Sequence, residues 1–469
     1  MAASGNDTTL DVSGFLDARR MSRFHYTLLV VSCFVTFFDG LDFSLISYTL
    51  PYLREQLSLD ATMTGYVTAA AFLGQMIGSL FGSYVADLYG RRPVVIWCTM
   101  LGAVFTFITG LAGSAEMIIF LRFLGGLAIG GLLAPAWSIN IESMPAGKKA
   151  TAVTIIMLGF SAGGAAAGQV TNLLAPEHGW QAVFFACGAA TGALALILLF
   201  TMPESARWLV TKQKPAATIT KALARFDPRI RNAGYSQFVL SDERKTTSSE
   251  SPLAKSAELF KGTLGIITPL IWATYFCSSF AIYLRSSYGV VFLEALGVGR
   301  AEATNIGSIG GLIGAVGGVL VLMFTERRGP AWIAAVPLLG IPAMLAIGWG
   351  LDGGPWFIPI IMLGTIMVGI GHAAVISMTS IYYPSAVRAT GGGWASFVAK
   401  FAAVAAPIVG SAWFIADKPA VQAGYVFTAA CLAGVVLGVL ALAVFARRLA
   451  TEHGAASLIE EETEVAAGA

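Results

Sequence analysis

Long apolar stretches alternate with short polar ones along most of this 469-residue chain. A run of about 20 mostly apolar residues is long enough to cross a bilayer as a helix. Twelve such runs are present, and they predict an all-α membrane protein with six helices on each side of a polar central stretch. They lie near residues 25–50, 63–86, 93–112, 117–141, 150–173, 180–201, 265–292, 302–325, 331–351, 356–381, 392–415 and 421–446.

The polar stretches divide the chain into five predicted parts. These are an N-terminal tail at 1–24, a six-helix bundle at 25–202, a linker at 203–262, a second bundle at 263–447 and a C-terminal tail at 448–469. The linker contains SDERKTTSSESPLAKS, a composition typical of a flexible segment, together with room for a short amphipathic helix. The first tail ends in arginines without a small-residue cleavage site, so we expect no cleaved signal peptide.

The two halves repeat each other. Gly78, Gly82, Arg91 and Arg92 recur as Gly314, Gly318, Arg327 and Arg328, 236 residues later, and Pro145 and Lys149 recur as Pro384 and Arg388, 239 residues later. Such similar offsets indicate duplicated six-helix halves related by pseudo-symmetry. Glycines four residues apart either let helices slide past each other or only pack them.

Composition and charge narrow the class of protein. Hydrophobic residues make up 56% and charged residues 12%, against about a quarter charged in soluble chains. The net charge of +2 forms no basic stripe, and the five cysteines lack metal-ligand spacing, so we expect no nucleic acid, disulfide, metal or cofactor. Basic residues of the short loops gather on one side, which the positive-inside rule makes cytoplasmic, with both termini inside.

Two acids interrupt the first apolar run, in the string FFDGLDFSL. Asp39 and Asp42 share a helix face, and a charge at that depth costs roughly 2.5 to 3.5 kcal/mol, so a functional role is the default interpretation. Arg122 enters the fourth span within reach of Asp42. We expect Arg122 to pair with deprotonated Asp42 and to release it on protonation. A purely structural ion pair, or an Arg122 that snorkels to the headgroups, is the alternative.

Three ionisable residues lie well inside spans of the second half: Arg285, His372 and Lys400. A carboxylate in a dry cavity must be paired or hydrogen-bonded, so Lys400 is the first candidate anchor, supported by His372 and Arg285. His372 as a packing residue and Arg285 as a snorkelling one are the alternatives. Some aromatic residues are candidates to stack on a substrate ring, although most in such a chain face the core or lipid: Tyr48, Trp137, Phe160, Tyr275 and Trp394.

Charged residues also cluster where the spans end on the predicted cytoplasmic side. Alternating acids and bases there suggest salt bridges that close this side in one state and break in another, whereas the simpler interpretation is that they only set orientation. This candidate cytoplasmic gate comprises Gly82, Asp87, Arg91, Arg92, Glu142, Glu204, Arg207 and Arg388.

The string GSYVADLYGRRP at 82–93 resembles the signature loop of the major facilitator superfamily. Within it, FDGLD, LRFLGGLAIGGLLAPAWSINIESMP and YYPSAVRATGGGWA resemble the aromatic acid:proton symporter family. The second half departs from the loop pattern, since Met323 stands at the position that matches Asp87.

The resemblance implies proton-coupled uptake of an aromatic carboxylate or related acid across a bacterial inner membrane, by alternating access of a lipid-embedded monomer. A sugar or sugar-acid transporter, an uncoupled facilitator or exchanger, a drug exporter and a receptor without flux are the rival functions. An enzyme is not expected, because the spans contain no nucleophile and base or metal constellation.

Overall fold

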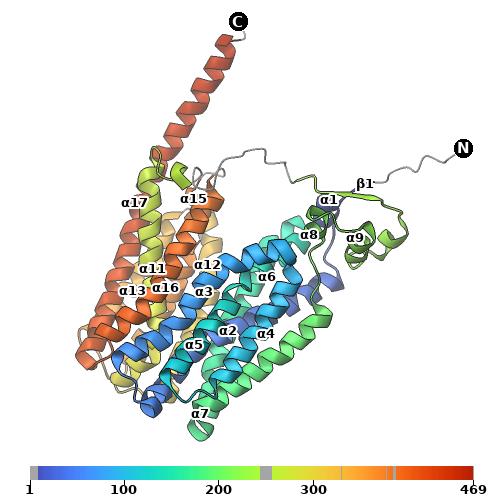
Figure 1. Cartoon of the computed structure of the whole chain (residues 1–469). Coiled ribbons are helices and arrows are strands. Elements are labelled where there is room, and N and C mark those ends of the chain that lie inside the picture. The colour runs from blue at the N-terminus through green and yellow to red at the C-terminus, as the bar shows by residue number, and fades with distance from the viewer. Residues whose placement is uncertain (1–8, 243–255, 329, 377, 384–386, 468–469) are drawn as a thin grey trace, which may run out of the picture. The chain divides into compact units, whose positions relative to one another are not determined.

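The computed structural model describes residues 9–242, 256–328, 330–376, 378–383 and 387–467, with only the backbone at 150, 322–328, 330–331, 380–381, 389 and 446–467. The chain divides into two compact units, the first Met1–Ser248 and the second Ser249–Ala469. Each unit consists almost wholly of helices, coloured along the chain in Figure 1. The division falls inside the segment that the sequence assigns to a linker.

The first unit has seven α-helices before its polar C-terminal segment. That segment adds two short α-helices, a 3-10 helix and a strand. The elements are β1 (Thr9–Asp11), α1 (Val12–Asp17), α2 (Arg23–Leu57), α3 (Ala61–Tyr89), α4 (Arg91–Thr109), α5 (Ala115–Gly130), α6 (Leu133–Ser143), η1 (Ala146–Lys148), α7 (Lys149–Thr201), α8 (Ala206–Thr211), α9 (Ala216–Leu223), η2 (Pro228–Asn232) and β2 (Gln237–Val239).

Every described secondary-structure element of the second unit is a helix. Its elements are α11 (Leu264–Ala295), α12 (Arg300–Arg328), η3 (Pro330–Ala334), α13 (Ala335–Gly348), α14 (Phe357–Ile376), α15 (Met378–Tyr382), α16 (Arg388–Trp413) and α17 (Lys418–Ala467). The backbone of α17 continues well past the predicted end of the last span, into the predicted C-terminal tail. The side chains of Met323, Arg327 and Arg328 lie outside the described part of the chain.

Ten helices of the described chain are long and apolar enough to cross a membrane. One of them, α7, comprises two helices that meet at Gly179, where the backbone is not helical. Gly179 has φ +76°, a backbone conformation in which glycine avoids the strain that a side chain would meet. A shorter apolar helix, Trp332–Gly348, falls in the predicted ninth span. The predicted all-α membrane fold is therefore confirmed, and the turn at Gly179 separates the predicted fifth and sixth spans.

One predicted span is interrupted. The fourth is split into α5 and α6, and Pro135, which lacks an N–H, lies in the first turn of α6, where that N–H is not needed. Helices α14 and α15 both fall in the predicted tenth span, and the residue between them lies outside the described part of the chain. Periodicity alone does not reveal the break before α6, since the apolar run continues across it.

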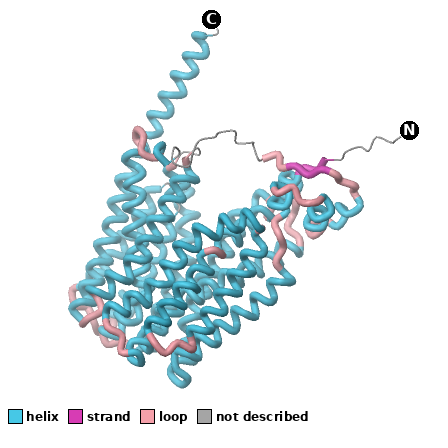
Figure 2. Tube along the Cα trace, viewed as in Figure 1, coloured by secondary structure: helices cyan, strands magenta, loops and turns pink. Residues whose placement is uncertain are grey.

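Part of the predicted linker and of the N-terminal tail is folded, and α9 fits the short amphipathic helix that the sequence allows. The string SDERKTTSSESPLAKS lies outside the described residues except for its first two residues and its last. Residues 9–17 and 206–242 fold together into what we call the loop module. Strands β1 and β2 pair in parallel, with Leu10 opposite Phe238, and they are drawn in magenta in Figure 2. Val12, Leu16 and Leu223 belong to a small apolar core under the strands. Apolar residues scattered through a polar stretch are enough to build this core.

Glycines bring the helices of the first unit into backbone contact. A methyl group added at Gly163 of α7 would lie 1.7 Å from the main-chain oxygen of Phe37 on α2. The same addition at Gly40 would meet the main-chain oxygen of Phe160 at 1.9 Å, and at Gly82 it would meet Gly131 Cα at 2.2 Å. These glycines therefore pack helices closely, as small residues do in membrane interfaces.

The second unit repeats one of these crossings. An added methyl group at Gly314 of α12 would lie 3.4 Å from Gly369 Cα on α14, and at Gly318 it would lie 2.5 Å from Ala373 Cβ. In the first unit the corresponding glycines of α3 pack against α5 in the same way. The duplication seen in the sequence is therefore a duplication of helix packing.

We predict that Gly163→Ala destabilises the protein by about 1 to 3 kcal/mol, the usual cost of overpacking. The added methyl group would force α7 away from α2 at Phe37. Gly192→Ala on the same helix is the matched control, because its nearest neighbour would be 3.9 Å away. Thermal melting of the purified protein should show a lower Tm for Gly163→Ala only. Equal melting of the two variants would mean that the crossing has room to spare.

Candidate functional site

Asp42 of α2 and Arg122 of α5 form an ion pair inside the first unit. Arg122 Nη1 lies 2.9 Å from Asp42 Oδ1, and Nη2 lies 3.1 Å from Oδ2. Nη2 also donates to the main-chain oxygen of Asp42 at 3.0 Å. Only 4% of Asp42 and 1% of Arg122 is exposed, so the two charges meet out of water, where their attraction is strongest.

Two more helices contribute to this site. Thr106 of α4 donates its hydroxyl hydrogen to Asp42 Oδ1, and the ring of Phe184 on α7 lies 6.0 Å from the guanidinium carbon of Arg122. We call Asp42, Thr106, Arg122 and Phe184 the Asp42 site. Removal of one charge from a buried pair strands the other, at a cost of about 3 to 5 kcal/mol. Protonation of Asp42 would change the charge balance in the same sense.

Asp39 lies one helical turn before the Asp42 site. Asp39 is 3% exposed. It directly precedes Gly40, where the backbones of α2 and α7 touch. Because the two acids are three residues apart, they share one side of α2. Helix α2 therefore carries two buried acids on one side, and the second of them pairs with the buried Arg122 of α5.

The second unit holds a buried arginine of a different kind. Arg285 of α11 is 6% exposed, and its Nη2 donates to the hydroxyl oxygen of Thr365 on α14 at 2.6 Å. Its Nη1 is buried without a hydrogen-bond partner, and no carboxylate of the described residues lies within ion-pair distance. A guanidinium stays charged in a protein, so Arg285 keeps a positive charge that the described part of this unit does not neutralise.

A second polar pair joins the same two helices. Ser278 Oγ of α11 and His372 Nδ1 of α14 share a hydrogen bond of 3.1 Å. The ring of Tyr283 stands edge-on to the imidazole, with 6.3 Å between centroids. The interpretation of His372 as a packing residue is thus incomplete, because it has a specific polar partner.

The other predicted binding residues of the second unit lie elsewhere. Lys400 is half-buried on α16. Trp394 is 40% exposed and donates to Ser256 Oγ at 3.0 Å, while the hydroxyl of Tyr275 donates to the main-chain oxygen of Ile376 at 2.7 Å. Tyr275 precedes Arg285 by ten residues, about 15 Å of helix. Tyr275 is therefore separated from Arg285 along α11, and the binding roles of Trp394, Tyr275 and Lys400 stay predictions.

In the first unit, the predicted aromatic residues lie in different surroundings. Tyr48 is buried on α2, six residues beyond Asp42. Trp137 packs against an apolar cluster that includes Val35, and the ring of Phe160 lies 5.4 Å from that of Phe43. Phe160 is the one of the three that adjoins the acids, through the contact of its backbone with Gly40.

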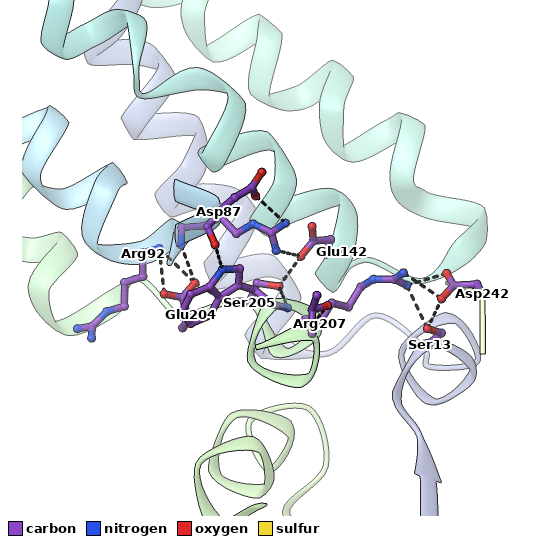
Figure 3. Close-up of polar contacts among 11 residues, drawn as sticks. Ser13, Asp87, Arg92, Glu142, Glu204, Ser205, Arg207 and Asp242 are labelled. Atoms are coloured by element: carbon purple, nitrogen blue, oxygen red, sulfur yellow. Dashed lines mark hydrogen bonds and ion pairs between the residues drawn. The ribbon is translucent and has the colours of Figure 1, made fainter. Parts of the chain in front are cut away.

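Figure 3 shows a polar cluster where α3, α4, α6 and α8 meet. Arg91 Nη1 lies 2.7 Å from Glu142 Oε2, and the hydroxyl of Ser205 donates to the same oxygen. Asp87 is more distant from Arg91, at 3.8 Å, and its side chain is 70% exposed. Arg91 and Glu142 are therefore the strong ion pair here, and Asp87 adds little.

Glu204 acts on backbone rather than on an arginine side chain. Its Oε1 accepts the main-chain N–H groups of Arg91 at 3.1 Å and Arg92 at 3.2 Å. These N–H groups belong to the first turn of α4, where N–H groups have no acceptor within the helix. Glu204 therefore caps the N-terminus of α4. The Arg92 side chain donates instead to the main-chain oxygen of Leu199 at 2.6 Å. In the second unit, Arg388 is exposed and donates to the main-chain oxygen of Tyr383 at 3.2 Å.

Arg207, another residue of the predicted gate, pairs with Asp242. Its two terminal nitrogens lie 2.8 and 2.9 Å from the carboxylate oxygens, and Ser13 donates to the same group (Figure 3). Hydrogen bonds from Arg207, followed by that from Ser13, lower the pKa of Asp242 from its ordinary 3.8 to about 2. Its contribution to folding is present above pH 4 and is lost as pH falls toward 2. The loop module thus keeps this link at any physiological pH.

Several residues of these sites escaped the sequence analysis. Thr106 and Thr365 are hydroxyl side chains within apolar helices and carry no periodic signal. Asp242 lies in a polar stretch that composition assigns to a flexible linker, and Ser13 lies in the N-terminal tail. Thr106 could have been found only by asking which hydroxyl-bearing residue lies at the depth of Asp42.

Comparison with known proteins identifies relatives over most of the chain. A family model described as Major Facilitator Superfamily matches residues 32–407. The 4-hydroxybenzoate transporter PcaK of Pseudomonas putida is 28% identical over 415 residues, 86% of this chain and 91% of its own. A gallate transporter of the same organism is 28% identical over 87% of this chain and 89% of its own. A solved D-xylose-proton symporter matches with a TM-score of 0.68 at 19% identity, over 90% of this chain and 97% of its own, which shows the fold alone.

We predict that Asp242→Asn loosens the loop module, because it removes the negative charge that faces Arg207. Asp242 is 48% exposed, so the loss should be at most about 1 kcal/mol. Trypsin should then cut the purified protein after the exposed Arg20 roughly two- to fivefold faster. The exposed Glu116→Gln is the control, expected to leave the cleavage rate unchanged. An unchanged rate for Asp242→Asn would mean that the module is held by its apolar core alone.

Proposed function

Because the chain belongs to the major facilitator superfamily, we propose that it imports an aromatic or related organic carboxylate together with protons. Membership makes the chain a multi-pass membrane transporter and not an enzyme. Proton coupling and an acidic substrate are our proposals beyond what family membership shows. The named substrates of relatives, 4-hydroxybenzoate and gallate, are aromatic acids and support this choice.

The observation that carries the proposed coupling is the buried Asp42–Arg122 ion pair. Of the two partners only Asp42 can take up and release a proton, because a guanidinium does not give one up. A proton that arrives at Asp42 removes the negative charge that neutralises Arg122 in a dry site. The resulting uncompensated charge favours a different arrangement of the helices that carry the pair.

Asp39 provides a second acidic group on the same helix side. The two acids give the first unit more than one position for a proton, and Arg122 can neutralise only one of them at a time by a two-point contact. We assign the primary proton site to Asp42 because the arginine contacts that residue directly. Asp39 is then the second member of the pathway.

The proposed anionic substrate follows from Arg285. A buried cation without a carboxylate partner among the described residues of its unit costs several kcal/mol, and a bound carboxylate would remove that cost. Arg285 therefore replaces Lys400 as the first candidate anchor, with Lys400 as a support. A guanidinium also binds a carboxylate through two parallel hydrogen bonds, which fixes its orientation.

We place both termini and the loop module on the cytoplasmic side of a bacterial inner membrane. The excess of Arg and Lys in the loops of that side supports this orientation through the positive-inside rule. In this orientation the Arg91–Glu142 pair and the Glu204 cap lie at the cytoplasmic ends of α4 and α6. They are the part of the predicted gate that we retain, as links that hold the first unit together at that end.

The coupling can be tested with the full-length protein in liposomes. An inward gradient of one pH unit supplies about 1.4 kcal/mol, enough for about tenfold accumulation per coupled proton. The wild type should reach such accumulation with an acid found by screening benzoates, hydroxybenzoates and phenylpropanoids. Asp42→Asn should lose pH-driven accumulation yet retain exchange of labelled for unlabelled acid, because exchange needs no net proton movement.

The exposed Glu116→Gln is the control and should accumulate the acid like the wild type. If Asp39→Asn and Asp42→Asn both keep full pH-driven accumulation, proton coupling through these acids is wrong, and an uncoupled facilitator or exchanger remains. If no organic acid is accumulated by the wild type, the proposed substrate class is wrong.

A further inference from the structure

Thr106 uses its hydroxyl differently from Thr99, another buried threonine of α4. Thr99 donates to the main-chain oxygen of Val95, four residues earlier, at 2.8 Å. Threonines in helices commonly make this bond within their own helix. Thr106 donates instead across to Asp42 Oδ1 on α2. Because a hydroxyl has a single hydrogen to donate, this contact replaces the bond that Thr106 would otherwise make to Gly102.

Two side chains among the described residues hydrogen-bond the Asp42 carboxylate. Arg122 donates to both of its oxygens, and Thr106 donates to Oδ1. A guanidinium carries five donors and no acceptor, whereas a hydroxyl oxygen can donate and accept. Of the two partners, Thr106 is therefore the one that can also receive a hydrogen bond from Asp42.

Two further titratable groups belong to the surroundings of Asp42. Cys187 of α7 interacts electrostatically with the carboxylate, but a thiol is only a weak hydrogen-bond acceptor. Asp39 lies one turn earlier on α2, and its charge enters any titration of Asp42 because neighbouring acids titrate together. Titrations are therefore best compared between variants that share both groups.

We propose that Asp42 takes up its proton on Oδ1 and that the oxygen of Thr106 then accepts the hydrogen bond from the new acid. A protonated carboxyl has one hydrogen to donate, and a buried donor without an acceptor is destabilising. The hydrogen of Thr106 turns to the main-chain oxygen of Gly102, the kind of acceptor that Thr99 already uses. This assignment rests on the proposed function and locates its proton on one oxygen atom.

Proton uptake then has different effects on two helix contacts. The contact between α2 and α4 is kept, because the hydrogen bond between Asp42 and Thr106 only reverses its direction. The contact between α2 and α5 is weakened, because Arg122 loses the negative charge that it faces. The helix released on protonation is therefore α5, while α4 stays attached to α2.

The test is an infrared pH titration of the purified full-length protein. The carbonyl band that Asp42→Asn removes reports the proton on Asp42. Thr106→Val deletes the hydroxyl, and the bond it makes to the carboxylate is stronger than the bond it makes to the neutral acid. The midpoint of the band should therefore move to higher pH by roughly one unit. The band should also change in wavenumber, because the acid loses its acceptor.

Further variants separate the hydroxyl from the fold. Thr106→Ser keeps a hydroxyl and should titrate like the wild type. Thr99→Val is the matched control, because Thr99 and Thr106 lie on the same helix and are each 3% exposed. It should leave both the midpoint and the wavenumber unchanged. Melting temperatures establish that each variant is folded, and Thr106→Ala, which also lacks the hydroxyl, takes the place of Thr106→Val if the latter does not fold.

An unchanged midpoint and wavenumber in the folded variant without the hydroxyl would overturn the assignment. An equal shift in Thr106→Ser and Thr106→Val would overturn it too, because the hydroxyl would not be the cause. Both results would leave the proposed function intact, since the wild type would still show a proton on Asp42. A wild type without any band that depends on Asp42 would contradict the proposed function as well as the role of Thr106.

Discussion

The buried ion pair of Asp42 and Arg122 is the interaction on which this account depends. Two opposite charges out of water stabilise each other only while both are present, so a change of one alters the balance of the whole site. Because Thr106 and Phe184 also contact the pair, four helices of the first unit meet there. A proton at Asp42 is therefore a local event with consequences for the packing of α2, α4, α5 and α7.

Close helix packing is the reason that we expect protonation of Asp42 to affect the arrangement of the helices. Gly40 and Gly163 hold α2 and α7 backbone against backbone next to the acids, so these two helices have no room to move closer. Packed interfaces respond by switching between arrangements rather than by gradual deformation. The second unit repeats the glycine crossing of α3 and α5 in α12 and α14, and its buried Arg285 lies on α11. The duplicated scaffold thus carries different buried charges, an acid–base pair in the first unit and an arginine in the second.

The sequence predicted the parts of this protein that rest on long-range pattern. Apolar runs long enough to cross a bilayer predicted the spans. Asp39 and Asp42 stood out because acids are rare inside such a run. The sequence did not reveal features that local contacts decide: the break before α6 inside the fourth span, the Arg207–Asp242 pair, and the folding of part of a polar stretch around a few apolar side chains. Partners such as Thr365 could not be found, because a hydroxyl in a membrane helix is ordinary until the fold places a charge beside it.

The most direct test of the account is an infrared pH titration of the purified protein that follows the carbonyl band of protonated carboxylic acids. The account predicts that lowering the pH produces a band in the wild type that is missing in Asp42→Asn. It also predicts that this band shifts its midpoint when Arg122 is replaced by glutamine, because the neighbouring charge is gone. An identical titration in the wild type and Asp42→Asn would contradict the claim that Asp42 takes up the proton.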